Sequence, residues 1–187
     1  MNREEFQTLR GNAAKTRKDL FASKTVIQVV LDGGSIPSGA KTTLAKFKQL
    51  LADSGRSDIE IHQTSSFGAM WMEPTIFISK PGAPRIVYGE VDADRAATLW
   101  QRYVLDNDPC PELAFAWMDW THTYPDYMWA KGPNQEAYKA IPHIGQTDWG
   151  RLQQRIVLRH TGDIDPESIE DFMAVGATKP LTKLCTA

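Results

Sequence analysis

Thr25-Val-Ile-Gln-Val-Val-Leu-Asp-Gly-Gly-Ser-Ile-Pro-Ser-Gly-Ala40 is the segment from which the architecture of this chain follows. Its first seven residues are rich in β-branched side chains and have the length of a β-strand. Ser38 and Gly39 then interrupt the chain, and a helix is expected over residues 40–52. Four apolar side chains share one face of that helix: Leu44, Phe47, Leu50 and Leu51. A strand followed at once by an amphipathic helix predicts a layered α/β domain.

The next segments continue this pattern. Residues 59–64 alternate apolar and polar side chains, as a half-buried strand does. Residues 75–79 and 85–88 are expected to form two more strands, because the stretch between them contains the Pro and Gly of a turn. Asp92 is suited to cap a helix on which apolar residues recur at helical spacing, namely Ala96, Leu99, Trp100, Tyr103 and Val104. The resulting order, β-α-β-β-β-α, is similar to the thioredoxin plan.

The segments on either side of this domain are less regular. Residues 4–22 carry a broken apolar stripe and are expected to form an N-terminal helix. Residues 107–150 are loop-like, rich in aromatic side chains and interrupted by five prolines. Regularity returns at residues 154–159, and a short helix is expected with Asp165 as its N-cap and Pro166 at its first position. The predicted divisions are 1–24 (N-terminal helix), 25–106 (thioredoxin-like domain), 107–150 (aromatic-rich linker or insertion) and 151–187.

The composition excludes several classes of protein. The 187 residues carry a formal charge of -2, which argues against a nucleic-acid binder with a cationic surface. No apolar run approaches the roughly 20 residues that span a bilayer, and the N-terminus lacks the apolar core of a secretion signal. The two cysteines, Cys110 and Cys185, make neither a disulfide framework nor a C-x-x-C pair. We expect a soluble cytoplasmic protein without nucleic-acid partners or membrane insertion.

Two stretches of the chain resemble parts of known redox proteins. Residues 30–40 and 64–74 together resemble the two ligand loops of a thioredoxin-like [2Fe-2S] domain, with the spacing C-x4-C…C-x3-C. Residues 154–173 resemble the sequence that opens the FMN domain in flavoprotein subunits of NADH dehydrogenases, NAD(P)-reducing hydrogenases and NAD-dependent formate dehydrogenases. In that family a thioredoxin-like [2Fe-2S] module commonly precedes this opening. The resemblance therefore extends from about Thr25 to Leu184.

Two departures from that family decide the expected chemistry. Cysteine is absent from all four positions that would ligate the cluster, which hold Val30, Ser35, Ser66 and Met70. A cluster of this type needs four thiolates or close substitutes, whereas these side chains offer no donor, two protonated hydroxyls and a neutral thioether. The glycine-rich motif of the FMN and NADH site is also absent before Ala187. We therefore expect no cofactor and assign no catalytic, metal-ligating or flavin-binding residue.

The aromatic segment within residues 107–150 is the second candidate site. In one interpretation its rings fold back onto the sheet and enlarge a small core. In the other they form a docking surface, because Trp and Tyr dominate the energetics of protein interfaces. The residues expected to contact a partner are Trp117, Trp120, Tyr124, Tyr127 and Trp129.

The favoured function is that of a non-catalytic thioredoxin-like subunit in an NADH-linked oxidoreductase complex. Its partners would be flavoprotein or iron–sulfur subunits, which it would help to assemble without passing electrons. A second hypothesis is a detached N-terminal part of an NADH-oxidising flavoprotein whose FMN domain is on another chain. A third is a module that binds a small ligand or metal in the vacated cluster pocket. Such a metal site would use His62, Ser66 and Met70, and backbone N–H groups at residues 35–39 would suit an anion.

Overall fold

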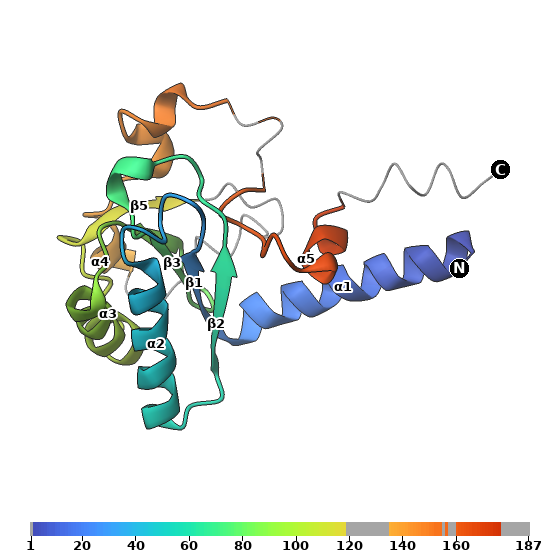
Figure 1. The fold of residues 1–187 in the computed structure, drawn as a ribbon, viewed down its shortest axis with the longest axis horizontal. Coiled ribbons are helices and arrows are strands. Elements are labelled where there is room, and N and C mark those ends of the chain that lie inside the picture. Colours follow the sequence, from blue (N-terminus) through green and yellow to red (C-terminus); the bar gives the residue numbers. More distant parts are fainter. Residues whose placement is uncertain (1, 119–134, 155, 157–159, 177–187) are drawn as a thin grey trace.

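The computed structural model describes residues 2–118, 135–154, 156 and 160–176, which contain a five-stranded mixed sheet (Figure 1). The strands lie in the order β2-β1-β3-β4-β5. β1 and β2 are parallel, whereas β3, β4 and β5 each run antiparallel to the preceding neighbour in that order. Helix α2 connects β1 to β2. This is a thioredoxin-like arrangement, so the expected fold class is confirmed. The strand bounds are β1 Thr25–Val30, β2 Ile59–Thr64, β3 Ile76–Ser79, β4 Arg85–Tyr88 and β5 Ala114–Met118.

The three long helices lie where the sequence predicts them. Helix α1 (Arg3–Ser23) begins with a capping box, in which the side chains of Asn2 and Glu5 each accept the other's backbone N–H. Helix α2 (Ala40–Ser54) ends at Gly55, whose φ of 63° is a conformation that favours glycine. Helix α3 (Ala93–Leu99) is capped by Asp92 and continues as a π-helical turn (Trp100–Leu105). The single helix expected here therefore changes its pitch at Trp100.

Both faces of the sheet are covered, which is why every residue of β1 is buried. On one face Ile27 and Val29 pack with α2, α3 and the π-helical turn in the main core. On the other face Val30 packs with a smaller apolar cluster that includes Phe77 and Val87. Because strand side chains alternate between faces, Gln28 also points to this second face. There it accepts a hydrogen bond from Arg85 of β4 and donates one to the backbone carbonyl of Asp163 in the last described segment.

Strand β5 corrects the prediction that residues 107–150 are loop-like throughout. It pairs with β4 across a register shift between Val87 and Tyr88 and becomes an edge of the sheet. Its sequence, Ala114-Phe-Ala-Trp-Met118, contains no proline and no polar residue, so it can bury both faces against the domain. Short helical segments follow at α4 (Gln135–Tyr138), Ile144–Gln146 and Gly150–Leu152.

The C-terminal helix also differs from the prediction. Helix α5 (Ile169–Ala174) is capped by Ser168, whose side chain accepts the N–H of Asp171, and not by Asp165. Asp165 instead accepts the N–H of Glu167 in the preceding turn. Most of the regular stretch expected at residues 154–159 lies outside the described residues. Within the part of the chain that is described, no helix has both the length and the apolar character needed to cross a membrane.

Candidate functional site

The candidate site is built from two loops, residues 31–39 and 65–75, which we call the paired loops. They follow β1 and β2, and because these strands are parallel and end at paired residues, both loops leave the same edge of the sheet. The N–H of Leu31 continues the ladder by donating to the Thr64 carbonyl at 2.9 Å. Topology therefore brings together two segments that the sequence separates by about thirty residues.

Asp32 joins the paired loops through its carboxylate. One oxygen accepts the backbone N–H groups of Gly34 and Ser35, each at 2.9 Å, and the other accepts the N–H of Ser66 at 3.1 Å. Burial raises the pKa of Asp32, but the hydrogen bonds from Ser35, Gly34 and Ser66 outweigh it, so the net pKa is lowered. An ionised carboxylate thus links the first loop to the second.

The four positions that resemble cluster ligands have different environments. Val30 is fully buried in β1, and its N–H donates to the Thr75 carbonyl at 3.0 Å. The buried Ser35 hydroxyl accepts the Asp32 N–H at 2.7 Å. Ser66 donates its hydroxyl to Glu73 at 3.1 Å, and the Met70 sulfur lies 4.0 Å from the same hydroxyl. Ser66 and Met70 therefore meet, whereas Val30 contributes only to packing.

Met70 also covers the first loop. A Cβ added at Gly34 would lie 2.0 Å from the terminal methyl of Met70, so a larger residue there would force the flexible Met70 side chain to move. The carboxylate of Glu73, which accepts the Ser66 hydroxyl through one oxygen, accepts the backbone N–H of Thr75 at 2.8 Å through the other. Burial raises the pKa of Glu73, in contrast to that of Asp32. Protein groups therefore fill the space between the paired loops and satisfy one another.

These residues do not fit an iron–sulfur cluster. The hydroxyls of Ser35 and Ser66 are held in hydrogen bonds within the protein, and the thioether of Met70 is a neutral ligand. The cysteine of the described chain, Cys110, is buried on the main-core side, where burial raises its pKa to about 11. Among the described residues, no group of three or more His, Cys, Asp and Glu side chains could hold a metal ion. The paired loops therefore lack the four thiolates that a [2Fe-2S] cluster requires.

The structure sets His62 apart from Ser66 and Met70, the other two residues of the hypothetical metal site, and engages backbone groups of the hypothetical anion site. His62, in β2, has its Nε2 atom 2.9 Å from Glu60, and no contact joins His62 to Ser66 or Met70 among the interactions of the described residues. The backbone N–H groups of Ser35 and Gly39 donate to Asp32 and Ile36 within the loop itself. These two N–H groups, which could have bound an anion, are therefore already engaged.

The paired loops carry an apolar surface that the sequence analysis missed. Its exposed members are Ile36 (40% exposed), Met70 (54%) and Trp71 (58%). The ring of Trp71 packs edge-on against Trp149 at 5.8 Å and Phe115 at 6.5 Å between centroids. Trp71 directly follows Met70, one of the four predicted ligand positions, and this was an available signal, but Trp149 joins the pair only through the tertiary fold.

The aromatic residues expected to contact a partner are only partly described. Trp117 lies in β5, partly buried against the main core, with its ring 4.4 Å from that of His143. Tyr138 is buried in the same core. The rings of Trp117 and Tyr138 therefore pack against the domain. The other expected contacts lie outside the described residues: Trp120, Tyr124, Tyr127 and Trp129.

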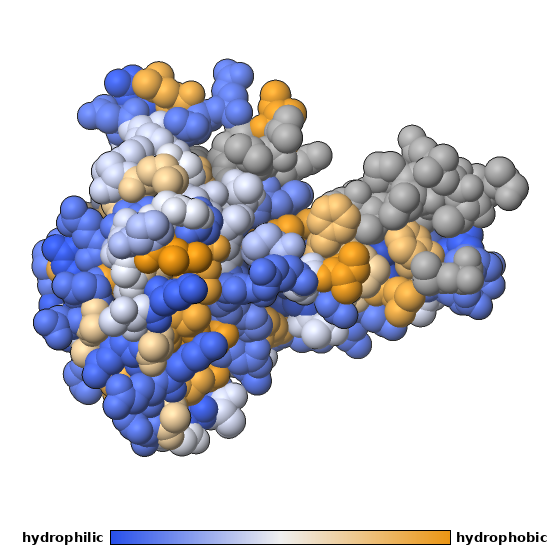
Figure 2. Space-filling view, in the orientation of Figure 1, coloured by the Kyte–Doolittle hydropathy of each residue, from blue (hydrophilic) through white to orange (hydrophobic). Residues whose placement is uncertain are grey.

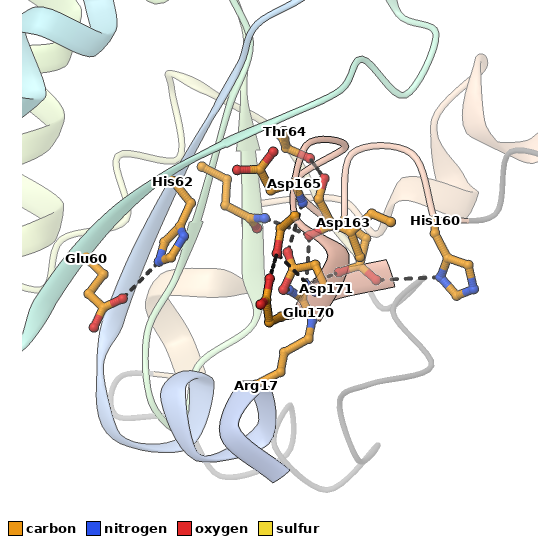
Figure 3. A network of polar contacts seen from close by, with 12 residues as sticks. Arg17, Glu60, His62, Thr64, His160, Asp163, Asp165, Glu170 and Asp171 are labelled. Carbon is orange, nitrogen blue, oxygen red and sulfur yellow. Dashed lines mark hydrogen bonds and ion pairs between the residues drawn. The ribbon is translucent and has the colours of Figure 1, made fainter. Parts of the chain in front are cut away.

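The second polar centre of the molecule lies on the opposite side of β1 from the main core (Figure 3). Arg17 of α1 donates to the backbone carbonyl and carboxylate of Asp163 at 2.7 and 2.9 Å, and pairs with Asp171 of α5 at 2.8 Å. Gln28 donates to the Asp163 carbonyl at 2.7 Å and accepts from Arg85 at 2.6 Å. This cluster, which we call the rear ion network, fixes residues 160–174 against α1 and the sheet.

Asp163 is the centre of the rear ion network. Burial raises its pKa, but the nearby side chain of His160, 3.8 Å away, and the charges of Arg17 and Arg85 outweigh this effect, so the net pKa is lowered. Gln63 and Thr64 of β2 add hydrogen bonds to Asp165 and to the Ile164 carbonyl. Residues 160–171, which belong to the segment that resembles an FMN-domain opening, therefore pack on this domain.

Comparison with known proteins gives one sequence relative. No protein-family model matches the chain. The NADP-reducing hydrogenase subunit HndB of Solidesulfovibrio fructosivorans is 34% identical over 93 residues, which cover 50% of this chain and 74% of HndB.

Solved structures give similar folds at low identity. The wild-type thioredoxin-like [2Fe-2S] ferredoxin of Aquifex aeolicus has a TM-score of 0.45 and 13% identity, over 51% of this chain and 99% of that chain. A cysteine-to-serine variant of that ferredoxin has a TM-score of 0.44 and 15% identity, over 49% and 98% of the two chains.

Proposed function

The chain belongs to the family of the NADP-reducing hydrogenase subunit HndB, and from this premise we propose that it is a subunit of a hydrogenase-type, NAD(P)H-linked redox complex which carries no iron–sulfur cluster itself. In this role it joins flavoprotein or iron–sulfur subunits without transferring electrons. It is not catalytic alone.

The observation that carries this proposal is the Asp32 carboxylate between the paired loops. A metal cluster would tie such loops together through covalent ligation, and metal binding often supplies folding energy. Here three backbone N–H groups converge on one ionised side chain and make that connection. The loops therefore keep a defined shape with protein groups alone, which supports a scaffold retained for assembly.

Metal and sulfide analysis tests the cluster-free state. We expect the protein purified without oxygen to be colourless, with no absorption in the visible range and no acid-labile sulfide. A brown, paramagnetic sample with iron and sulfide in amounts equal to one cluster per chain would contradict the proposal.

Co-purification tests the role in assembly. A tag is placed on the hydrogen-activating subunit of the host's NAD(P)H-linked hydrogenase, and the amount of this chain in the isolated complex is measured. We expect a fixed stoichiometry with the tagged subunit. Absence of the chain from the intact complex would count against the proposal.

A second function rests on residues 154–173, whose sequence resembles the opening of an FMN domain. The chain would then be the detached N-terminal part of an NADH-oxidising flavoprotein. The docking of residues 160–174 by Arg17 and Arg85 favours this possibility, since it gives an adjoining flavin domain a fixed point of attachment. A separate polypeptide with the FMN motif should then bind this chain and oxidise NADH in its presence. An FMN protein that neither binds it nor changes activity would exclude this second function.

A further inference from the structure

The last described residues, 160–176, which we call the strap, bury polar groups against the domain. Within the strap only Gly162 and Asp163 are buried, so none of its apolar side chains is fully enclosed. Figure 2 shows that apolar side chains instead come to the surface over α5 and the neighbouring part of α1. Ile169 is 59% exposed and Phe172 is 44% exposed. Apolar burial therefore contributes much less to the docking of the strap than to the two cores of the sheet.

The buried contacts of the strap converge on Asp163. Arg17 of α1 donates to one carboxylate oxygen of Asp163 at 2.9 Å, and the Nη1 atom of Arg85 lies 3.7 Å from the same oxygen. Gln28 donates to the backbone carbonyl of Asp163 at 2.7 Å, and Arg85 donates to that of Gly162. Side chains from α1, β1 and β4 thus surround one carboxylate and the turn that carries it (Figure 3).

The domain positions these three side chains with its own residues. The Arg85 guanidinium lies 4.3 Å from the ring centroid of Phe77 in β3, and Arg85 donates to Gln28 at 2.6 Å. The Arg17 guanidinium lies 4.9 Å from the ring centroid of Phe21, one turn later in the same helix. None of these three contacts involves the strap. Donors that are positioned in advance lose little conformational entropy on binding, and arginine suits the two oxygens of a carboxylate.

We propose that Arg17, Arg85 and Gln28 form a carboxylate-binding site of the domain, which the strap occupies through Asp163 and can leave while the sheet stays folded. The strap is then a built-in ligand that covers the site. The external ligand is a carboxylate, because a carboxylate is what these side chains bind in the structure. A neutral group in the same place would not compensate the charge of the buried arginines. This inference goes beyond the proposed function and does not depend on it.

Hydrogen exchange of the full wild-type chain tests whether the strap can leave. The protein is compared in sodium acetate and in sodium chloride at the same concentration of about 0.3 M, so that charges are screened equally. Acetate bound to the open site stabilises the state without the docked strap, so the amides of Gly162 and Asp163 should exchange about fivefold faster or more in acetate. The amides of Ile27 and Val29 in β1 exchange when the sheet itself opens, and their rates should not rise.

Two results of this measurement would overturn the proposal. Equal exchange rates of the strap amides in the two salts would show that no carboxylate competes with Asp163. An equal acceleration at Ile27 and Val29 would show that the strap leaves only when the sheet unfolds.

Removal of the Asp163 carboxylate tests the site directly. In Asp163→Gly, acetate should raise the midpoint of thermal unfolding by about 2–5 °C relative to chloride, because it replaces the missing carboxylate. Asp165→Gly is the matched control, since Asp165 lies in the same strap but accepts from Gln63 and from the N–H of Glu167. This control and the wild type should show no such rise. A midpoint of Asp163→Gly that is equal in both salts, or an equal rise in Asp165→Gly, would overturn the carboxylate site. If Asp163→Gly does not fold, hydrogen exchange of the wild type decides the question.

Discussion

The paired loops and the rear ion network each join separated parts of the chain through one aspartate, but they use different partners. Asp32 accepts backbone N–H groups and connects residues 34 apart, whereas Asp163 is paired with an arginine 146 residues away. Backbone N–H groups are present whatever side chains the residues carry. The connection through Asp32 therefore depends little on the identity of its partner residues. The connection through Asp163 buries charged side chains, which stabilise the fold only while all of their charged partners are present. The local connection is therefore robust, and the distant one is specific.

The largest expected effect comes from removing a charge in the rear ion network. Arg17→Met leaves the buried Asp163 with less compensation and should lower the free energy of unfolding by about 3–5 kcal/mol. Urea unfolding of the full chain measures this. The double variant Arg17→Met/Asp163→Asn should recover part of the loss, because it removes a buried charge. A loss below about 1 kcal/mol for Arg17→Met would mean that the network is not formed as described.

A smaller loss is expected at the paired loops. Asp32→Ala leaves three backbone N–H groups without their acceptor, but solvent reaches these partly buried loops. We expect the free energy of unfolding to fall by about 1–3 kcal/mol. Hydrogen exchange should also become faster at Gly34, Ser35 and Ser66, while the amides of β1 stay protected. Unchanged exchange at all three would contradict the bridging role of Asp32.

Lowering the pH should reduce the contributions of Asp32 and Asp163 to the free energy of unfolding by different amounts. Both have a lowered pKa in the folded protein, so each contributes stability above its unfolded pKa of about 3.8, and this is lost as the pH falls through the lower folded value. Asp163 faces two buried arginines, so Asp163→Asn should flatten the acid limb of the stability curve more than Asp32→Asn. Urea unfolding measured from about pH 5 to about pH 2 distinguishes them. A larger flattening for Asp32→Asn would reverse the comparison.

The smallest expected effect is that of a chelator. Because protein groups alone connect the paired loops, EDTA or a stronger iron chelator should leave the midpoint of thermal unfolding unchanged. The control is a metal-dependent domain treated in the same way. A fall of several degrees in this chain would show that a metal contributes to the fold.

The expected and observed folds agree where apolar patterning is local. Thr25–Val30, Ile59–Thr64 and the helix at Ala40–Ser54 follow from β-branched runs and helical periodicity, since burial of these side chains dominates over other preferences. The absence of four thiolates at the expected positions also follows from residue identities. The N-cap of α5 does not follow from residue identities, because Asp165 and Ser168 are both suitable caps. Neighbouring contacts decide between them.

Amino-acid order alone therefore decides strands β1 to β4, the long helices and the lack of cluster ligands in the paired loops, because each depends on residues close together or on their chemical type. Three features needed the folded molecule: β5 as an edge strand, the Asp32 connection between the paired loops, and the docking of residues 160–174. Each joins groups that are distant along the chain. Polar side chains show no periodicity that reveals such a partner, so only the topology of the sheet brings them within hydrogen-bonding distance.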